Sequence, residues 1–447
     1  MKRTLTLSAL LTLTIFATSI FAQTTIITTV AGNGVVGNSP DSTVANNTSI
    51  SYPNGLFVDH AGNIYYTEES KVRRIDAISG LIATIAGTGI SGFSGDGGPA
   101  TSARLYSPTQ IAFDAANNIY IADPVNTRIR KINAGTGTIT TIAGISGIGY
   151  TGNGGAATAA KMFPVSIAFN RTGDLFVAEG TSGHIRKIDM STGIITNYAG
   201  SDSIGGYGGD GGPATDAVLD NPAHICFDTA NNLYLSDFYR HVIRKISPAG
   251  VITTVAGIGY QGFNGDNGPA TAALLFSPSG LCISNTGDII FADYNNSRIR
   301  SINAATGIIT TLVGNGNNSD LGDGGPAINA ELKFPANVCI DDLDRIYIST
   351  KDKIRRTSIG FPTGIVNTMS KPASIYPNPS TGTFHITLAD ATPHLVDIFD
   401  ITGKNVGHSL SGVSSIPVDM GNMPDGIYTI SITTGNHIDH HKIIIRH

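Results

Sequence analysis

Several features that mark familiar classes of protein are missing from this sequence. The chain of 447 residues carries 28 basic and 33 acidic side chains, so it lacks the basic surplus that nucleic-acid binding requires. It contains no Gly-x-Ser-x-Gly, no His-Glu-x-x-His and no glycine-rich phosphate loop followed by lysine. These absences exclude nucleic acid as a partner and remove the usual motif evidence for a hydrolase, a zinc protease or a nucleotidase.

Cysteine is also scarce. The three cysteines are Cys226, Cys282 and Cys339, and none belongs to a Cys-x-x-Cys pair of the kind that binds zinc. Each occupies the same place in the internal repeat described below, which predicts a small buried side chain in a strand. A redox or metal role, or a disulfide between neighbouring copies, stays open at this point.

Long apolar runs are confined to the N-terminus. Residues 1–22 begin with Lys2 and Arg3, continue with an apolar run from Leu5 to Phe21, and end at Ala22. This pattern predicts a secretory signal peptide cleaved after Ala22 rather than a membrane anchor, because the run is short and diluted by Thr and Ser. No other segment approaches membrane length. We therefore expect an exported protein without a transmembrane segment.

What the sequence does contain is a repeat rich in glycine, which accounts for 54 residues. The stretch from Ser107 to Gly147 has four short apolar runs separated by turn residues, the pattern of a four-stranded antiparallel meander. Its opening proline recurs at intervals of 55 to 58 residues, at Pro53, Pro108, Pro164, Pro222, Pro278 and Pro335. Six copies at a near-constant period predict stacked or radially arranged units.

The two ends of the repeat region complement each other. Residues Ile26–Gly32 match only the last strand of a copy, whereas the sixth copy ends near Ile359 without its last strand. Pairing these two halves closes a ring and leaves no open sheet edge, unlike a solenoid with capped ends. The sequence therefore predicts an all-β fold with a six-bladed β-propeller over residues 23–360.

The second hairpin of each copy carries a more specific signal. Ile119-Tyr-Ile-Ala-Asp123-Pro-Val-Asn126-Thr-Arg128-Ile-Arg130 resembles NHL repeats, and the segment from Ile290 to Arg300 has the same form. The resemblance implies a propeller that acts mainly as an interaction platform, with a minority of related enzymes. The first and sixth copies have shortened second turns, and the third has Glu179 and His184 in place of Asp and Arg. We expect Asp123, Asp237 and Asp293 to pair with Arg128 or Arg298 across this hairpin.

After a linker at residues 361–373, residues 374–447 form a second unit. Alternating apolar residues and turn glycines predict a small β-sandwich of about seven strands. The tail resembles the type A C-terminal sorting domain of the type IX secretion system of Bacteroidetes, at Tyr376, Pro377, Asn378, Pro379, Gly382, Gly403, Gly426, Tyr428 and Lys442. The resemblance implies interaction with that secretion machinery and a secreted or surface-attached protein; an ordinary adhesion-like sandwich is the alternative.

The mouth of the central channel is where propeller enzymes usually place their chemistry. The residues two positions after each opening proline should lie near it, and these are Gly55, Gln110, Ser166, His224, Gly280 and Asn337. A divalent metal needs charged oxygens or several imidazoles, whereas this set has one histidine and no carboxylate. We therefore expect His224 to be a hydrogen-bonded polar residue, and no catalytic residue and no cofactor is predicted. The multiple histidines of the lyases related to NHL proteins are missing.

Insertions between the blades offer the strongest candidate surface. Four of them repeat an aromatic residue three positions before Asp or Asn, giving Phe93 and Asp96, Tyr150 and Asn153, Tyr207 and Asp210, and Phe263 and Asp266. Exposed, these rings would suit stacking on sugars or peptide side chains; the alternative is that each ring packs onto its own loop. Calcium binding by the Asp-Gly-Gly turns is another alternative, although they lack the alternating oxygen ligands of a dedicated loop.

These features favour a binding module for a protein or glycan, acting through the insertion-bearing face. His224 is included among its candidate residues because of its place at the channel. Two alternatives remain: a hydrolase or lyase with its site at the central channel, and a structural or adhesion component of the cell surface. Whether the protein is an enzyme is left undecided by the sequence, which favours a non-catalytic role.

Overall fold

A computed structural model describes residues 25–202, 206–358, 374–376, 378, 380–387, 394–400, 405–411, 415–434 and 437–447. The predicted signal peptide therefore lies outside the described residues. Contacts divide the chain into two units, Met1–Gly364 and Ile365–His447, which are described separately.

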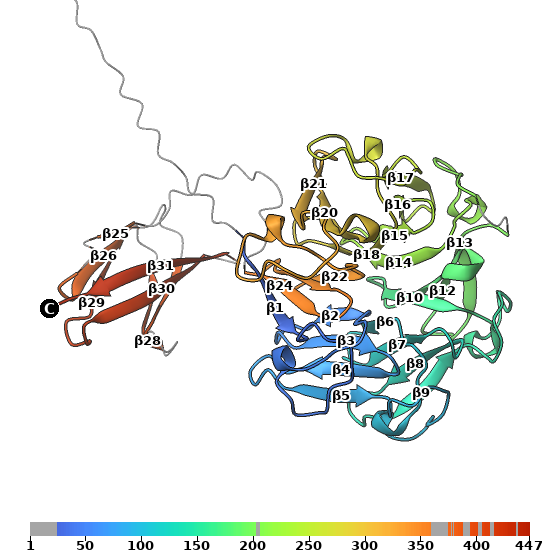
Figure 1. The fold of residues 1–447 in the computed structure, drawn as a ribbon, viewed down its shortest axis with the longest axis horizontal. Helices are drawn as coiled ribbons and strands as arrows, with labels where there is room; N and C mark the ends of the chain where they lie inside the picture. The colour runs from blue at the N-terminus through green and yellow to red at the C-terminus, as the bar shows by residue number, and fades with distance from the viewer. Residues whose placement is uncertain are drawn as a thin grey trace, which may run out of the picture. The chain divides into compact units, whose positions relative to one another are not determined.

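The first unit is a ring of six four-stranded antiparallel sheets, or blades (Figure 1). In the first five blades the chain runs outward from an inner strand through all four strands, and each inner strand of the ring contacts those of both neighbouring blades. The strands of the six blades are β2 (Leu56–Val58), β3 (Ile64–Glu68), β4 (Lys71–Ile75) and β5 (Ile82–Ala86); β6 (Gln110–Phe113), β7 (Ile119–Asp123), β8 (Arg128–Ile132) and β9 (Ile139–Ala143); β10 (Pro164–Phe169), β11 (Leu175–Glu179), β12 (His184–Ile188) and β13 (Ile195–Ala199); β14 (Pro222–Phe227), β15 (Leu233–Asp237), β16 (Val242–Ile246) and β17 (Ile252–Ala256); β18 (Pro278–Ile283), β19 (Ile289–Asp293), β20 (Arg298–Ile302) and β21 (Ile309–Val313); and β22 (Asn337–Ile340), β23 (Ile346–Ser349), β24 (Ile354–Thr357) and β1 (Ile27–Ala31).

The ring closes as the sequence predicts. Strand β1, from the start of the described chain, pairs antiparallel with β24 and becomes the outer strand of the sixth blade. Apolar side chains of adjacent blades meet between the sheets; for example, Ile129 of the second blade lies in one core cluster with Val177 of the third. The three cysteines, all free, lie on the inner strands β14, β18 and β22 and pack against such clusters.

Each outer strand ends at a glycine that cannot be replaced without strain. Gly144 has a φ of +95°, and a Cβ at this position would lie 2.1 Å from the carbonyl oxygen of Thr127. The backbone thus turns into the insertion directly over the neighbouring hairpin, which explains why this glycine recurs in every copy.

The insertions between blades cover the outer edges of the sheets. Gly97 N–H donates to the carbonyl oxygen of Ile139 in β9 at 2.8 Å, and Ile139 N–H donates to Gly98 at 3.0 Å. The insertion before the sixth blade bonds in the same way to Ile27 of β1. Each contains a short 3-10 turn: η1 (Ala45–Asn47), η2 (Ala100–Ser102), η3 (Ala157–Ala159), η5 (Ala214–Asp216), η6 (Ala270–Ala272) and η8 (Ala327–Asn329). These contacts satisfy backbone groups that would otherwise form an open edge.

A fully buried arginine on the third strand of each blade fixes the insertion in place. In the fifth blade, Arg300 donates to Asp266 Oδ1 at 2.7 Å, to the carbonyl oxygens of Asn264 and Leu274 at 2.8 and 3.0 Å, and to Asp293 Oδ2 at 3.2 Å. Its guanidinium thus connects the insertion to the end of β19. The equivalent residues, all 0% exposed, are Arg73, Arg130, Arg186, Arg244 and Arg355.

Polar residues of the inner strands close the central channel. Gln110 Nε2 lies 2.8 Å from His224 Nε2, although the two residues belong to the second and fourth blades, and Asn337 Nδ2 donates to Gln110 Oε1 at 3.3 Å. Gly55 and Gly280 leave room for this network, since a Cβ at Gly280 would lie 2.5 Å from Asn337 Cα. Burial lowers the pKa of His224 to about 4, so the imidazole is neutral; its Nδ1 accepts from Leu281 N–H at 3.4 Å, and its Nε2 faces the Gln110 amide. We call Gln110, His224 and Asn337 the channel floor.

The second unit contains a three-stranded and a four-stranded antiparallel sheet. Side chains from both sheets, such as Phe384 and Ile430, share one core. The strands are β25 (Ser374–Tyr376), β26 (Thr383–Thr387), β27 (His394–Phe399), β28 (Asn405–Ser411), β29 (Ser415–Asp419), β30 (Gly426–Thr434) and β31 (His437–Ile445). The predicted seven-stranded sandwich is thus confirmed for the described residues.

Replacing Arg300 by methionine is expected to lower the free energy of unfolding by about 3–5 kcal/mol, because Asp293 stays buried without its positive partner. Urea denaturation of the full-length protein, followed by circular dichroism, measures the loss. Arg171→Met, on an exposed arginine, is the matched control and should change the free energy of unfolding by about 0.5 kcal/mol or less. Equal effects of the two substitutions would contradict a structural role for the buried arginine.

His224 should make the propeller sensitive to acid. Its pKa is lowered to about 4 in the folded state, so below its ordinary value near 6.5 the unfolded chain takes up a proton that the folded chain does not. Stability is therefore lost as the pH falls from about 6.5 towards 4, by up to about 3 kcal/mol. Thermal unfolding at a series of pH values should show a shallower acid limb for His224→Gln. A limb of unchanged slope would contradict the burial of a neutral imidazole.

Candidate functional site

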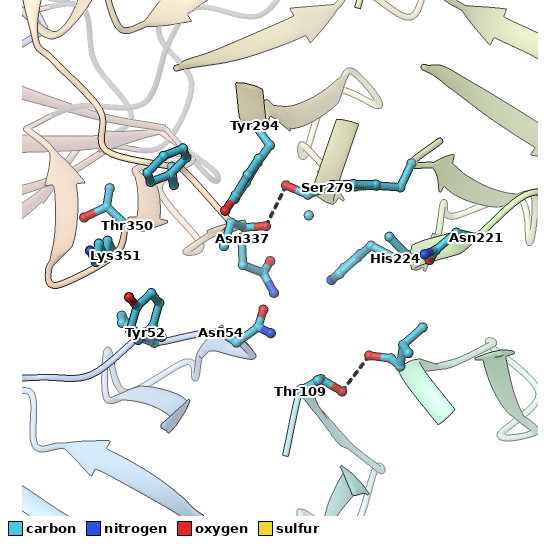
Figure 2. Close-up of a pocket in the computed structure, with 17 residues that line it drawn as sticks. Tyr52, Asn54, Thr109, Asn221, His224, Ser279, Tyr294, Asn337, Thr350 and Lys351 are labelled. Carbon is cyan, nitrogen blue, oxygen red and sulfur yellow. Dashed lines mark hydrogen bonds between the residues drawn. The ribbon is translucent and has the colours of Figure 1, made fainter. Parts of the chain in front are cut away.

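Above the channel floor lies a cavity of about 410 Å³, within the range of ~300–1,000 Å³ that is usual for small-molecule sites. It is built from the residues around the opening prolines and from the second turns of the fourth, fifth and sixth blades (Figure 2). Its lining residues are Tyr52, Pro53, Asn54, Thr109, Val165, Asn221, Ala223, His224, Phe238, Ser279, Gly280, Tyr294, Phe334, Ala336, Asn337, Thr350 and Lys351. All six blades contribute.

Aromatic side chains from four blades line this cavity: Tyr52, Phe238, Tyr294 and Phe334. The rings of Tyr294 and Phe334 are stacked, with centroids 5.5 Å apart and an interplanar angle of 28°, and Phe238 lies 6.1 Å from Tyr294. Tyr52 is 59% exposed. Burial raises the pKa of Tyr294, and the nearby Tyr52 adds to the rise, which agrees with the position of both residues at the mouth in Figure 2.

Two of these rings are held by strained backbone. Tyr52 and Phe334 have φ values of +44° and +50° and directly precede a proline, where helical and left-handed conformations are disfavoured for bulky residues. In three other blades the same left-handed position holds Ser107, Asn221 or Ser277. Strain of this kind costs about 1–3 kcal/mol and is typically retained at functional sites. The aromatic residues are thus placed at the mouth against a local conformational preference.

Polar groups complete the lining. Figure 2 shows Asn54, His224 and Asn337 directed towards the centre of the site. His224 and Asn337 are engaged in the channel floor, whereas the side-chain amides of Asn54 and Asn221 make no hydrogen bond to another residue in the described part of the chain. Among the described residues that line the cavity, Lys351 is the only charged one, and its Nζ lies 5.5 Å from the centroid of the Tyr52 ring.

The insertion aromatics lie on the same face but outside the cavity lining. Insertions and second turns are joined directly, for instance by Asn296 Nδ2, which donates to the carbonyl oxygen of Gly262 at 2.7 Å. Phe93 and Phe263 are 43% and 41% exposed and lie against the guanidinium groups of Arg128 and Arg298, whose Cζ atoms are 3.9 and 3.7 Å from the ring centroids.

The two tyrosines of this set have similar contacts. Tyr150 stacks on His184 with centroids 3.7 Å apart, and Tyr207, 44% exposed, donates to or accepts from Thr254 Oγ1 at 2.6 Å. Each of the four rings therefore packs against the blade that follows its insertion, and part of its surface stays open to solvent. Their role in binding stays a prediction.

The acidic residues beside these rings hold the buried arginines. Asp96 and Asp210 accept from Arg130 and Arg244 at 2.8 and 2.7 Å, as Asp266 does from Arg300, and Asn153 Nδ2 donates to the Tyr150 hydroxyl at 2.8 Å. Across the described ranges, no group of three or more His, Cys, Asp or Glu side chains is placed to hold a metal ion. The carboxylates of Asp96, Asp210 and Asp266 thus form structural ion pairs with the buried arginines.

One predicted pairing is wrong. Asp123 and Asp293 form their ion pairs with Arg130 and Arg300, at 3.9 and 3.2 Å, instead of with Arg128 and Arg298. Asp123 does face Arg128 in the strand register, but the Arg128 guanidinium donates to the carbonyl oxygen of Asn126. The next side chain on the same strand face, Arg130, is the buried one that reaches the carboxylate.

Seven residues that shape the cavity were not predicted from the sequence: Tyr52, Asn54, Asn221, Phe238, Tyr294, Phe334 and Lys351. The residues two positions after each proline were expected at the mouth, but those that meet across the channel form its floor, below the cavity. The available signal was the variation directly before the prolines, where Tyr52 and Phe334 replace the small polar residues of three other copies.

In the second unit, several of the predicted sorting residues have structural roles. Tyr428 donates from its hydroxyl to the carbonyl oxygen of Pro424 at 2.8 Å, and Asn378 Oδ1 accepts from Ile444 N–H at 3.0 Å. Gly382 has a φ of +106°, and a Cβ there would lie 2.7 Å from Gly421 Cα. Tyr376 ends β25, Gly426 begins β30 and Lys442 lies in β31. Pro377, Pro379 and Gly403 lie outside the described residues.

Comparison with known proteins agrees with both units. Residues 374–446 match the family "Secretion system C-terminal sorting domain". The chain is 31% identical over 270 residues to the protein SUPPRESSOR OF QUENCHING 1, chloroplastic, of Arabidopsis thaliana, which covers 57% of this chain and 25% of that protein. It is 24% identical over 292 residues to NHL repeat-containing protein 2 of Homo sapiens, which covers 58% of this chain and 40% of the relative. The chain thus spans less than half the length of these relatives.

Among solved structures, an auxiliary nutrient binding protein from Bacteroides thetaiotaomicron aligns with a TM-score of 0.55 at 17% identity, over 75% of this chain and 77% of that one. At this identity the likeness concerns the fold. No helix in the described part of the chain is both long and apolar enough to span a bilayer. Because a sorting domain directs export, the protein is secreted or held at the cell surface. The propeller is thus homologous to NHL-repeat proteins, and a C-terminal sorting domain of the type IX secretion system follows it in the chain.

Proposed function

We propose that this exported protein is a binding module whose ligand is a saccharide held in the cavity at the channel mouth. The observation that carries the proposal is the cavity itself, whose lining includes four aromatic side chains and the unpartnered amides of Asn54 and Asn221. Aromatic rings offer flat apolar surfaces for sugar rings, and an amide both donates to and accepts from hydroxyl groups. A surface location gives such a module access to extracellular glycans.

The chemistry of the lining favours binding over catalysis. General acid–base catalysis needs titratable groups near neutral pH that can reach the substrate. His224 is the one histidine in the lining, its pKa is lowered by burial, and its Nε2 is occupied by Gln110 in the channel floor. The described cavity lining contains no carboxylate to act with it. A hydrolase or lyase at this site stays the alternative, and a turnover abolished by His224→Gln would support it.

The structural neighbour that is named as a nutrient binding protein has the same fold at low identity. It makes a binding role reasonable for a propeller of this kind but says nothing of the ligand. The proposal therefore rests on the cavity of this chain.

Alanine at Tyr52 or at Phe334 is expected to weaken saccharide binding at least tenfold, which corresponds to about 1.4 kcal/mol. Isothermal titration of the full-length protein against a panel of oligosaccharides measures the affinity. Alanine keeps the Cβ and leaves the backbone strain at these left-handed positions as it is, and Tyr52 lies largely exposed, so the fold should be retained, as circular dichroism will show. Tyr260→Ala, at an aromatic residue that is 74% exposed and outside the cavity, is the control. Unchanged affinity in both cavity variants would refute the proposed site, and absence of binding to any glycan would favour a protein partner.

The insertion aromatics are proposed as outer contacts for longer ligands. Alanine at Phe93, Tyr150, Tyr207 and Phe263 together should weaken the binding of polysaccharides but leave the binding of short oligosaccharides intact. The fold should survive, because the buried arginines keep Asp96, Asp210 and Asp266 as partners. Affinities for long and short chains of one glycan, with thermal unfolding of the variant, provide the test. Unfolding of the variant would instead assign the four rings to packing alone.

A further inference from the structure

The cavity carries a positive charge that the protein does not neutralise. Lys351 belongs to the shortened turn between β23 and β24, and its backbone is fixed on both sides: its carbonyl oxygen accepts from Tyr52 N–H at 2.9 Å, and its N–H donates to Lys333 at 3.0 Å. The main chain of Lys351 is therefore held at the mouth, and its Nζ lies 5.5 Å from the centroid of the Tyr52 ring.

The acidic residues near Lys351 are paired with other groups. Asp352 pairs with Lys333 at 3.1 Å, and Asp320 accepts from Lys333 N–H and from Thr350 Oγ1 at 3.0 and 2.9 Å. On the opposite side of the mouth, Asp220 pairs with Arg240 at 2.6 Å. No carboxylate in the described part of the chain lies within ion-pair distance of Lys351.

This arrangement selects against cations. A group of aromatic rings would by itself attract a cationic ligand through the negative faces of the rings. Here the ammonium of Lys351 lies over the Tyr52 ring and would repel a second cation at the same place. A ligand with a negative charge gains an ion pair with Lys351 inside a cavity where solvent screening is reduced.

The site also has one entrance. Gln110, His224 and Asn337 close the channel below the cavity, with Nε2 atoms of Gln110 and His224 2.8 Å apart. A long chain therefore cannot pass through the propeller at this point. Only an end of the chain, or a short ligand, can place a sugar between the aromatic rings and the amides of Asn54 and Asn221.

Resting on the proposed function, we infer that the ligand is an acidic saccharide bound by a chain end, whose anionic group pairs with Lys351. The sugar ring lies against the aromatic side, and its hydroxyl groups bond to the unpartnered amides. A uronic-acid carboxylate and a sulfate ester both supply the required charge, and the test separates these two sources.

The experiment compares matched acidic and neutral ligands by isothermal titration of the full-length protein. The ligands are short oligogalacturonates and their methyl esters, and sulfated and desulfated oligosaccharides of one backbone. The acidic form of at least one pair should bind at least tenfold more tightly than its neutral partner. The preference should fall as salt is raised from about 0.05 M to about 0.5 M, because ions screen the pair. Whichever pair shows the preference identifies carboxylate or sulfate as the anion.

Lys351→Met should abolish this preference while retaining the weaker binding of the neutral ligand. Lys245→Met, in β16 and outside the cavity lining, removes the same charge from another part of the propeller and should leave the preference unchanged. Equal affinities for acidic and neutral forms, an unaltered preference in Lys351→Met, or no binding of any acidic ligand would overturn the inference. If neutral glycans still bind and Tyr52→Ala still weakens them, the proposed function stands and only the anionic specificity fails.

Discussion

The propeller depends on one repeated interaction, the burial of an arginine in each blade. Burying a guanidinium away from solvent lowers the stability of the fold unless its N–H groups find hydrogen-bond acceptors. In the fifth blade, Arg300 donates to Asp266, to Asp293 and to two main-chain carbonyls. These partners come from the insertion and from the end of β19, so the same residue fixes both. Since the insertion also covers the outer strand of its blade, the arginine links the solvent-exposed loops to the closure of the sheet edges.

Because each buried arginine needs its partners, some positions on the insertion-bearing face must be similar in every blade, whereas other positions can differ between blades. The acidic residue of the insertion is fixed as the arginine's partner, and the aromatic residue three positions earlier rests on the arginines of the third strand. Positions around the opening prolines have no such duty. Tyr52 and Phe334 occur there in adjacent blades, while Asn221 occupies the same position in the fourth. The residues that differ between blades are thus concentrated at the mouth of the channel, where all six blades contribute to one cavity.

The difference between repeated and individual positions explains what the sequence could and could not predict. The period of the prolines and the complementary ends predicted six blades and their closure. The residues two positions after the prolines were expected at the mouth; three of them, Gln110, His224 and Asn337, form the channel floor instead, with His224 hydrogen-bonded as expected. The pairing of Asp123 was wrong because strand register alone does not say which arginine is buried. The cavity was missed because its residues, such as Lys351 and Tyr294, share no pattern: they are defined by convergence from separate blades, which only the folded ring provides.

The binding site therefore forms only when the ring of blades closes. Lys351 precedes β24, and β24 is the strand with which β1 pairs to complete the sixth blade. The main chain of Lys351 in turn holds Tyr52, at the entry of the first blade, by a hydrogen bond of 2.9 Å. The charge and one wall of the cavity therefore come from opposite ends of the propeller sequence and meet only when the two ends are joined. A chain that fails to close leaves β24 without its partner strand and also lacks the binding site, so a ligand that requires both Tyr52 and Lys351 will stabilise the closed propeller selectively.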